Sequence, residues 1–191
     1  TNRQEMNDVG YKSARQISLS AFAPSSPYFN PDAQQPAYDP AKAKALLEEY
    51  GKPVNIVLEC ISTPEADLLL QVVKENWEAV GVTVTLKTQE QGAYVARMFS
   101  KKGDYQAACF RTGQFIEPDQ WRSTVGTDES SNLTFYSNAE VDALLAEGAS
   151  TADFETRKAA YFAAAKIVAL DGGGLPPKRA LCVHIQRVNR M

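Results

Sequence analysis

Residues 54–86 read VNIVLECISTPEADLLLQVVKENWEAVGVTVTL, and this stretch decides the fold class of the 191-residue chain. Its first seven residues alternate between two faces, as does the stretch from Val82 onward, and a period of two predicts strands. Between them, Thr63 and Pro64 begin a segment with apolar residues at helical spacing, which Gly81 ends. A strand, a helix and a second strand in this order predict a βαβ unit with parallel strands.

The sequence on either side extends this pattern. Upstream, Asp39 and Pro40 begin a predicted helix with the apolar stripe Ala43, Leu46, Leu47 and Tyr50, and Gly51 ends it. The stretch before it, residues 14–38, is loop-like, and its aromatic residues indicate a loop fixed to a surface. Downstream, a short helix over residues 94–99 leads into the apolar run 105–110, which predicts a strand covered on both faces.

The last third of the chain is predicted to be mostly helical. Ser137 and Glu140 form a capping-box pattern before one helix, and Asp153 can cap a longer one. A final strand is expected over residues 181–188. Together these elements predict an α/β fold with a mostly parallel sheet flanked by helices.

Composition and charge exclude some classes of protein. Twenty Lys and Arg against 23 Asp and Glu give a formal net charge of −3, which does not attract a polyanion, so no nucleic-acid partner is expected. The three cysteines, Cys60, Cys109 and Cys182, form no CxxC motif. We interpret them as small buried apolar side chains in preference to a disulfide, and they do not fix the redox compartment.

The sequence offers no chemistry for catalysis. It has no GxSxG elbow, Walker A loop or GxGxxG fingerprint, and Gly172–Gly174 follows a predicted helix instead of opening one. Its one histidine, His184, lies in a strand-like stretch, and no His, Cys or acidic residues have metal-ligand spacing. We therefore expect no enzyme activity, no metal site and no cofactor.

Three segments, in this order, resemble one family. They are SPYFNPDAQQPAYDPAKAKALLEEYG (26–51), ENWEAVGVTVTL (75–86) and FYSNAEVDALLAEGASTADFETRKAAYFAAAKIV (135–168). They are similar to the extracytoplasmic solute-binding proteins of family 5, the oligopeptide-, dipeptide- and nickel-binding receptors of ABC importers. The resemblance implies a periplasmic-binding-protein-like (type II) fold, with residues 1–191 forming a single C-terminal lobe whose first lobe is absent from this stretch.

The same resemblance implies a function. The protein would bind a peptide or a related small solute, anionic solutes included, in a cleft between two lobes, and deliver it to a membrane permease. We expect a periplasmic or otherwise extracytoplasmic monomer, held at the membrane by the importer or a lipid anchor. The alternative is the ligand-sensing module of a transcriptional regulator with the same fold, which the upstream sequence would distinguish.

Candidate ligand residues follow two strand ends, because open α/β sheets bind ligands outside the carboxyl ends of their strands. After the first strand, Ser62 and Thr63 could hold a polar group at a helix N-terminus; simple helix capping is the alternative. Some dipeptide binders of the family carry an Arg and a Tyr near Cys60 and Ser62 that clamp a carboxylate, and this chain has neither there.

The second candidate segment, Phe110 to Trp121, resembles the family's ligand loop. It supplies Phe110, Arg111, Thr112, Gly113, Gln114, Phe115 and Trp121. Gln114 occupies the position where many peptide binders have the Asp that pairs with the peptide's amino group, and a neutral amide cannot make that charge-assisted bond. Arg111 could hold a carboxylate in its planar fork, or pair with Glu117 or Asp119. Phe115 and Trp121 could line an apolar subsite or pack in the core.

Overall fold

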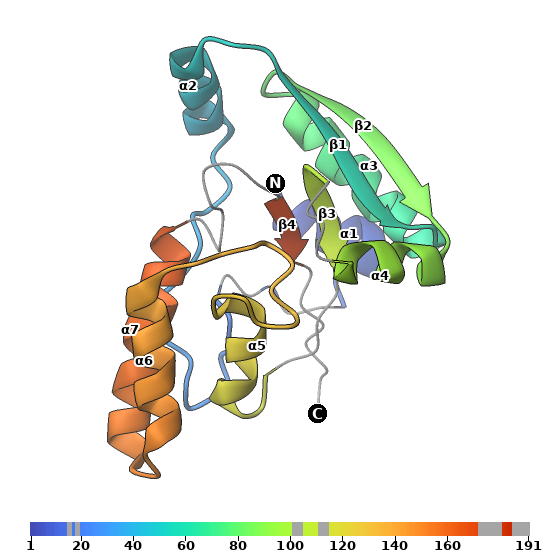
Figure 1. Ribbon diagram of the computed structural model, residues 1–191. Helices are drawn as coiled ribbons and strands as arrows, with labels where there is room; N and C mark the ends of the chain where they lie inside the picture. The colour runs from blue at the N-terminus through green and yellow to red at the C-terminus, as the bar shows by residue number, and fades with distance from the viewer. Residues whose placement is uncertain (15–16, 18–19, 101–104, 111–114, 172–180, 185–191) are drawn as a thin grey trace.

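The sheet has four strands, all parallel. The computed structural model describes residues 1–14, 17, 20–100, 105–110, 115–171 and 181–184. Within them the strands β1 (Val54–Ile61), β2 (Val82–Gln89), β3 (Ala107–Phe110) and β4 (Leu181–His184) are arranged in the order β2-β1-β3-β4 (Figure 1). The predicted parallel α/β sheet is confirmed. Of the predicted last strand, residues 185–188 lie outside the described residues.

The third strand is shorter than the sequence predicts. It begins at Ala107, two residues after the expected start at Tyr105. The reason is that the side chain of Gln106 takes the place of a ladder pair: its Oε1 accepts from Val57 N at 2.8 Å and its Nε2 donates to Asn55 O at 3.4 Å. Tyr105 is nonetheless buried, as are Ala107 and Ala108, so the expected covering of this strand on both faces is confirmed at these positions.

Helices α1 (Arg3–Tyr11), α3 (Pro64–Glu78) and α4 (Gln91–Phe99) flank the sheet (Figure 1). Helix α3 packs between α1 and the strands, and its apolar face joins Leu58 and Val84 in one core. Leu58 has no exposed surface, and burying a side chain of this size stabilises the fold by about 1.5–3 kcal/mol. Helix α1 was not predicted, because its sequence is polar and lacks an apolar period.

The predicted helix starts are mostly confirmed. Asp39 accepts from Lys42 N at 2.9 Å, Thr63 from Ala66 N at 3.1 Å and Asp153 from Thr156 N at 2.9 Å. The capping box at Ser137 is wrong by one residue. Asn138 is the N-cap of α6 (Ala139–Ser150) and accepts from the amides of Glu140 and Val141, because its side-chain carbonyl reaches both.

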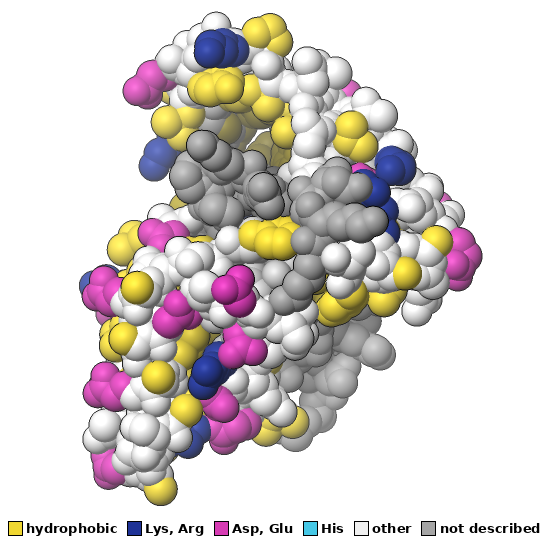
Figure 2. Space-filling model, in the orientation of Figure 1, with side chains coloured by type: hydrophobic (Ala, Val, Ile, Leu, Met, Phe, Trp, Pro, Cys, Tyr) yellow, Lys and Arg dark blue, Asp and Glu magenta, His cyan; other side chains and the backbone are white. Residues whose placement is uncertain are grey.

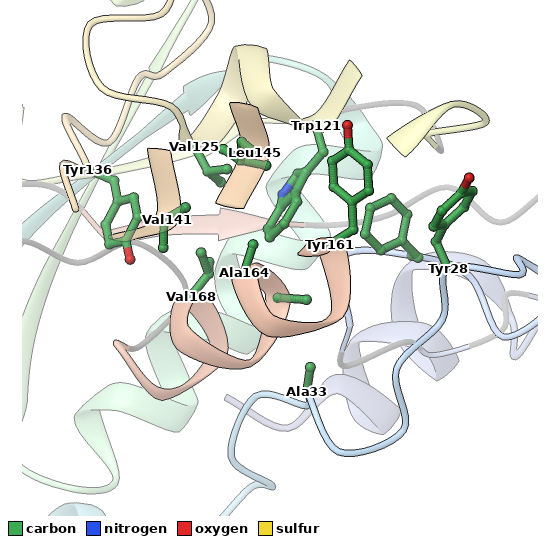
Figure 3. Close-up of a cluster of buried hydrophobic side chains, with 12 residues drawn as sticks. Tyr28, Ala33, Trp121, Val125, Tyr136, Val141, Leu145, Tyr161, Ala164 and Val168 are labelled. Carbon is green, nitrogen blue, oxygen red and sulfur yellow. The ribbon is translucent and has the colours of Figure 1, made fainter. Parts of the chain in front are cut away.

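A second hydrophobic core lies beside the sheet, around the antiparallel pair α6 and α7 (Phe154–Leu170). The turn η1 (Pro118–Trp121) and the short helix α5 (Arg122–Val125) cover one side of it. Figure 3 shows Trp121 pointing into this cluster, between Leu145 of α6 and Ala164 of α7. Phe22 and Tyr28 are buried here, so the prediction that the loop before residue 38 is fixed to a surface is confirmed.

Helix α2 (Pro40–Tyr50) begins and ends as predicted, with Gly51 in the left-handed conformation at φ 68°. Its predicted apolar stripe, however, is not buried by the described part of the chain. Leu46 is 55% exposed and Tyr50 60% exposed, and α2 stands apart from the sheet at the top of Figure 1. Figure 2 shows hydrophobic side chains on its surface, whereas acidic side chains are spread over α6 and α7.

Candidate functional site at the carboxyl ends of the strands

The carboxyl ends of β1 and β3 lie side by side, because the two strands are parallel and adjacent in the sheet. Beyond Ile61, Ser62 is exposed, and its backbone amide donates to Gln89 O at the end of β2 at 2.7 Å. Thr63 is half-buried, and its hydroxyl oxygen accepts from Ala66 N. The capping role of Thr63 is therefore confirmed. A contact of Ser62 or Thr63 with a solute stays a prediction.

An aromatic pair stands at the same edge. Phe110, the last residue of β3, is half-buried, and its ring meets that of Phe99 edge-on with the centroids 5.7 Å apart. Phe99 is 40% exposed at the end of α4. The sequence analysis placed Phe99 in a short helix and did not include it among the candidate site residues. Its position opposite the end of β3 depends on how α4 packs against the sheet, which the sequence does not show.

The second candidate segment is only partly described. Arg111, Thr112, Gly113 and Gln114 lie outside the described residues, so their roles stay predictions. Trp121 is 4% exposed, and its ring meets Phe22 edge-on at 5.5 Å. Phe115 packs against the same core from outside, with its ring 6.5 Å from that of Phe22. Both rings pack as the core alternative expects, and a solute contact of either stays a prediction.

The two carboxylates proposed as alternative partners of Arg111 both have partners on α7. Arg157 forms an ion pair with Glu117, and the hydroxyl of Tyr161 donates to Asp119 Oδ1 at 3.3 Å. Burial, together with the charge of Asp119, raises the pKa of Tyr161 to about 12. These contacts fix the segment after residue 115 to α7.

Cys60 and Cys109 form a disulfide between β1 and β3, with their Cα atoms 5.1 Å apart. The interpretation of all three cysteines as unpaired apolar side chains is therefore wrong for these two. The register explains why: Glu59 pairs with Ala108, so the next residue on each strand is a cysteine directly opposite the other. The 49-residue separation in sequence gave no sign of this pairing.

A buried carboxylate, which the sequence analysis also missed, lies beside the disulfide. Glu59 of β1 is 3% exposed and forms ion pairs with Arg97 at 3.0 Å and Lys87 at 3.1 Å. Its neighbour Gln89 donates to Glu59 Oε2 at 2.9 Å. A buried charge is tolerated only when it is paired and hydrogen-bonded in this way. The cluster thus joins β1, β2 and α4 just behind the strand ends.

Among the side chains that the structure describes, no group of three or more His, Cys, Asp and Glu is placed to hold a metal ion. Within the same described stretches, every helix is too short or too polar to cross a membrane.

Comparison with known proteins identifies the family. Residues 1–133 match the model of the bacterial extracellular solute-binding proteins, family 5 (middle region). The chain belongs to this family. Its sheet of parallel strands flanked by helices is the α/β fold of the type II periplasmic binding proteins.

Relatives of this family-5 chain include named receptors. It is 26% identical over 171 residues to the di/tripeptide-binding protein 3 of Pseudomonas aeruginosa, covering 84% of this chain and 32% of that protein. It is 29% identical over 179 residues to the heme-binding protein A of Haemophilus influenzae, covering 87% and 32%. The crystal structure of the ABC transporter substrate-binding protein CtaP from Listeria monocytogenes superposes with a TM-score of 0.79 at 25% identity, over 90% of this chain and 36% of that one. The chain thus spans about a third of the length of these relatives.

Proposed function

We propose that this chain is one lobe of the solute-binding component of an ABC importer, and that it holds a peptide or a related small solute against the carboxyl ends of β1 and β3. The observation that carries the proposal is the arrangement of these two ends. Exposed Ser62, half-buried Thr63 and the aromatic pair Phe99 and Phe110 all lie at the one sheet edge where α/β folds bind ligands. Membership of family 5 supports it independently.

The chemistry of this edge suggests the kind of solute. Ser62 and the first turn of α3 offer a hydroxyl and a positive helix end to a polar or anionic group. Phe99 and Phe110 offer partly exposed rings to an apolar group. A peptide carries both, with a charged backbone terminus beside apolar side chains. Solved relatives hold such molecules: one from Helicobacter pylori holds the peptide STSA, and one from Pseudoalteromonas holds Met-Leu.

The proposed site is completed by a second lobe, and the proposed partner of the closed protein is the membrane permease of the importer. We place the protein outside the cytoplasm, since the Cys60–Cys109 disulfide suits an oxidising compartment. One relative, the nickel-binding protein of Escherichia coli, is named as periplasmic. These named relatives are binding proteins, which gives no support to the alternative of a regulator's sensing module.

The experiment is calorimetry on the full-length protein that contains this chain, titrated with Met-Leu and with Ser-Thr-Ser-Ala. We expect one-to-one binding of at least one peptide, and Phe99→Ala should weaken it about fivefold to tenfold, as expected when a partly buried ring loses its contact. Phe154→Ala is the matched control, because Phe154 is 43% exposed but lies on α7. Equal affinities in the two variants would refute the proposed position of the solute.

A further inference from the structure

Strands β1 and β3, whose carboxyl ends form the proposed site, share only a short stretch of backbone pairing in the described part of the chain. Among the residues that the structure describes, the backbones of the two strands pair at two positions, Leu58 with Ala107 and Glu59 with Ala108. In contrast, β1 and β2 pair along eight positions, from Val54 to Ile61. Within this described part, the junction of β1 with β3 therefore has fewer backbone pairs than that of β1 with β2, although both β1 and β3 lead directly into the proposed site.

Two side-chain links extend this junction toward the carboxyl ends. The first is the Cys60–Cys109 disulfide, one residue beyond the last backbone pair. The second is Tyr94 of α4, which is 1% exposed and whose hydroxyl lies 2.5 Å from Cys109 O and 3.3 Å from Glu59 O. The hydroxyl thus spans the two strands at the level of the disulfide. A covalent bond and a buried hydrogen bond fix the same point.

The residues that follow are those of the proposed site. Ile61, Ser62 and Thr63 follow Cys60, and Phe110 follows Cys109 directly. Ile61 and Phe110 both pack against the small core that contains Tyr94. The distance between the polar and the aromatic part of the site is therefore set within one to three residues of the disulfide.

We propose that the Cys60–Cys109 disulfide is a positioning clamp for solute binding. It holds the Ser62–Thr63 segment and Phe110 at a fixed separation, so that the site is formed before the solute arrives, and preorganisation of this kind raises affinity. The inference rests on the proposed function. A disulfide that only stabilised the fold would affect the melting temperature and leave the geometry of the strand ends unchanged.

The test begins with the bond itself. Full-length protein exported to an oxidising compartment is digested without reduction and its peptides are mapped by mass spectrometry. We expect the peptides that carry Cys60 and Cys109 to be linked. Finding both as free thiols would overturn the proposal at once.

The second step compares Cys60→Ala/Cys109→Ala with two controls. Cys182→Ala removes the third cysteine alone. Gly148→Ala adds a Cβ to α6 that would lie 2.7 Å from Tyr161 of α7, so it is expected to lower stability away from the strand ends. Amide hydrogen exchange at 25 °C should rise at least fivefold at residues 61–63 and 110 in the double variant, and in neither control. Unchanged exchange at these amides would overturn the clamp whatever the protein binds.

Affinity for the peptide that the wild type binds, Met-Leu or Ser-Thr-Ser-Ala, provides the third reading. The double variant should bind it at least fivefold more weakly, while Gly148→Ala should bind as the wild type does. A lower melting temperature with unchanged affinity would show that the disulfide only stabilises the fold, and would overturn the proposal. If the wild type binds neither peptide, the proposed function fails for peptides, whereas the exchange experiment still decides whether the strand ends are clamped.

Discussion

Arg97 of α4 binds the buried carboxylate of Glu59 in β1 with two hydrogen bonds, from Nε to Oε2 at 3.1 Å and from Nη2 to Oε1 at 3.0 Å. Burial alone would raise the pKa of Glu59. The hydrogen bonds and charges of Arg97 and Lys87 outweigh it, and the pKa of this carboxyl lies below its usual 4.5. Glu59 is therefore ionised at neutral pH, and its charge holds β1, β2 and α4 together behind the proposed site.

Replacing this carboxylate should destabilise the fold in a pH-dependent way. Glu59→Gln leaves two cations without their counter-ion, and we expect a loss of about 1–3 kcal/mol in the free energy of unfolding near pH 7. Because the folded pKa is depressed, the contribution of Glu59 is fully present above pH 4.5 and is lost as the pH falls through the folded value. Urea unfolding of both proteins from pH 7 to pH 3 measures the difference.

The matched control is Glu78→Gln, which breaks an exposed i,i+4 pair with Lys74 on α3. Its urea midpoint should stay close to that of the wild type. A Glu59→Gln deficit that is the same size at pH 3 as at pH 7 would show that the charge of Glu59 is not what links these elements.

The raised pKa of Tyr161 on α7 leads to a second prediction, a loss of stability at alkaline pH. The pKa of Tyr161 is raised to about 12, so its contribution is fully present below pH 10 and is lost as the pH rises through 12. Tyr161→Phe should cost about 0.5–1.5 kcal/mol near pH 8, where the hydrogen bond to Asp119 is lost. Denaturant unfolding between pH 8 and 11.5 should then show a smaller decline for Tyr161→Phe than for the wild type. Parallel declines would contradict this assignment.

Close packing of α6 on α7 gives a third prediction. A Cβ at Gly148 would lie 2.7 Å from Tyr161 Cε2 and 2.9 Å from Tyr161 Cζ. Although alanine favours a helix by about 0.5–1 kcal/mol over glycine, overpacking of a buried site costs about 1–3 kcal/mol. We therefore expect Gly148→Ala to lower the melting temperature. Gly92→Ala in α4 is the comparison: there the new Cβ would lie 3.1 Å from Oε2 of Glu90, the exposed N-cap carboxylate, and the melting temperature should fall less. Equal melting temperatures in the two variants would contradict the packing argument.

The parallel sheet could be predicted from the sequence because each strand and helix of the βαβ unit has its own local sequence pattern. Alternation marks β1 and β2, and Thr63 and Gly81 limit the helix between them. Helix α1 has a local N-cap, Asn2, whose side chain accepts from Glu5 N at 3.2 Å, but no apolar period; tertiary contacts, such as Asn76 Nδ2 donating to Glu5 Oε2 at 2.9 Å, fix it against α3. Helix α2 shows the reverse case, a clear local pattern whose apolar face the described residues leave exposed.

The site was harder to predict because it depends on register. Alternation puts Glu59 on the more polar face of β1, yet α4 covers that face and buries it with Arg97. Likewise, nothing local pairs Cys60 with Cys109; the pairing follows from the alignment of β1 with β3. Phe99 joins the proposed site only because α4 ends opposite Phe110.

Arg111 remains the strongest sequence-based candidate for recognising an anionic group. It follows an apolar strand at its carboxyl end, and a guanidinium fork fits a carboxylate. In the full-length protein, Arg111→Met should weaken Met-Leu binding by about tenfold to a hundredfold, the usual value of a charge-assisted bond, and Arg111→Lys should weaken it less. C-terminally amidated Met-Leu, titrated in the same calorimeter, should show no such loss. A Met variant that melts lower but keeps its affinity would indicate a structural ion pair instead.

This chain is proposed to form half of a closed solute site, and native mass spectrometry of the full-length protein tests that proposal most directly. Protein isolated from its own cells without denaturation should carry one small molecule per chain, which leaves on unfolding and whose fragments identify it. Refolded, solute-free protein should regain the same mass shift when that molecule is added. A protein that carries no small molecule and takes up none from a peptide mixture would contradict the account.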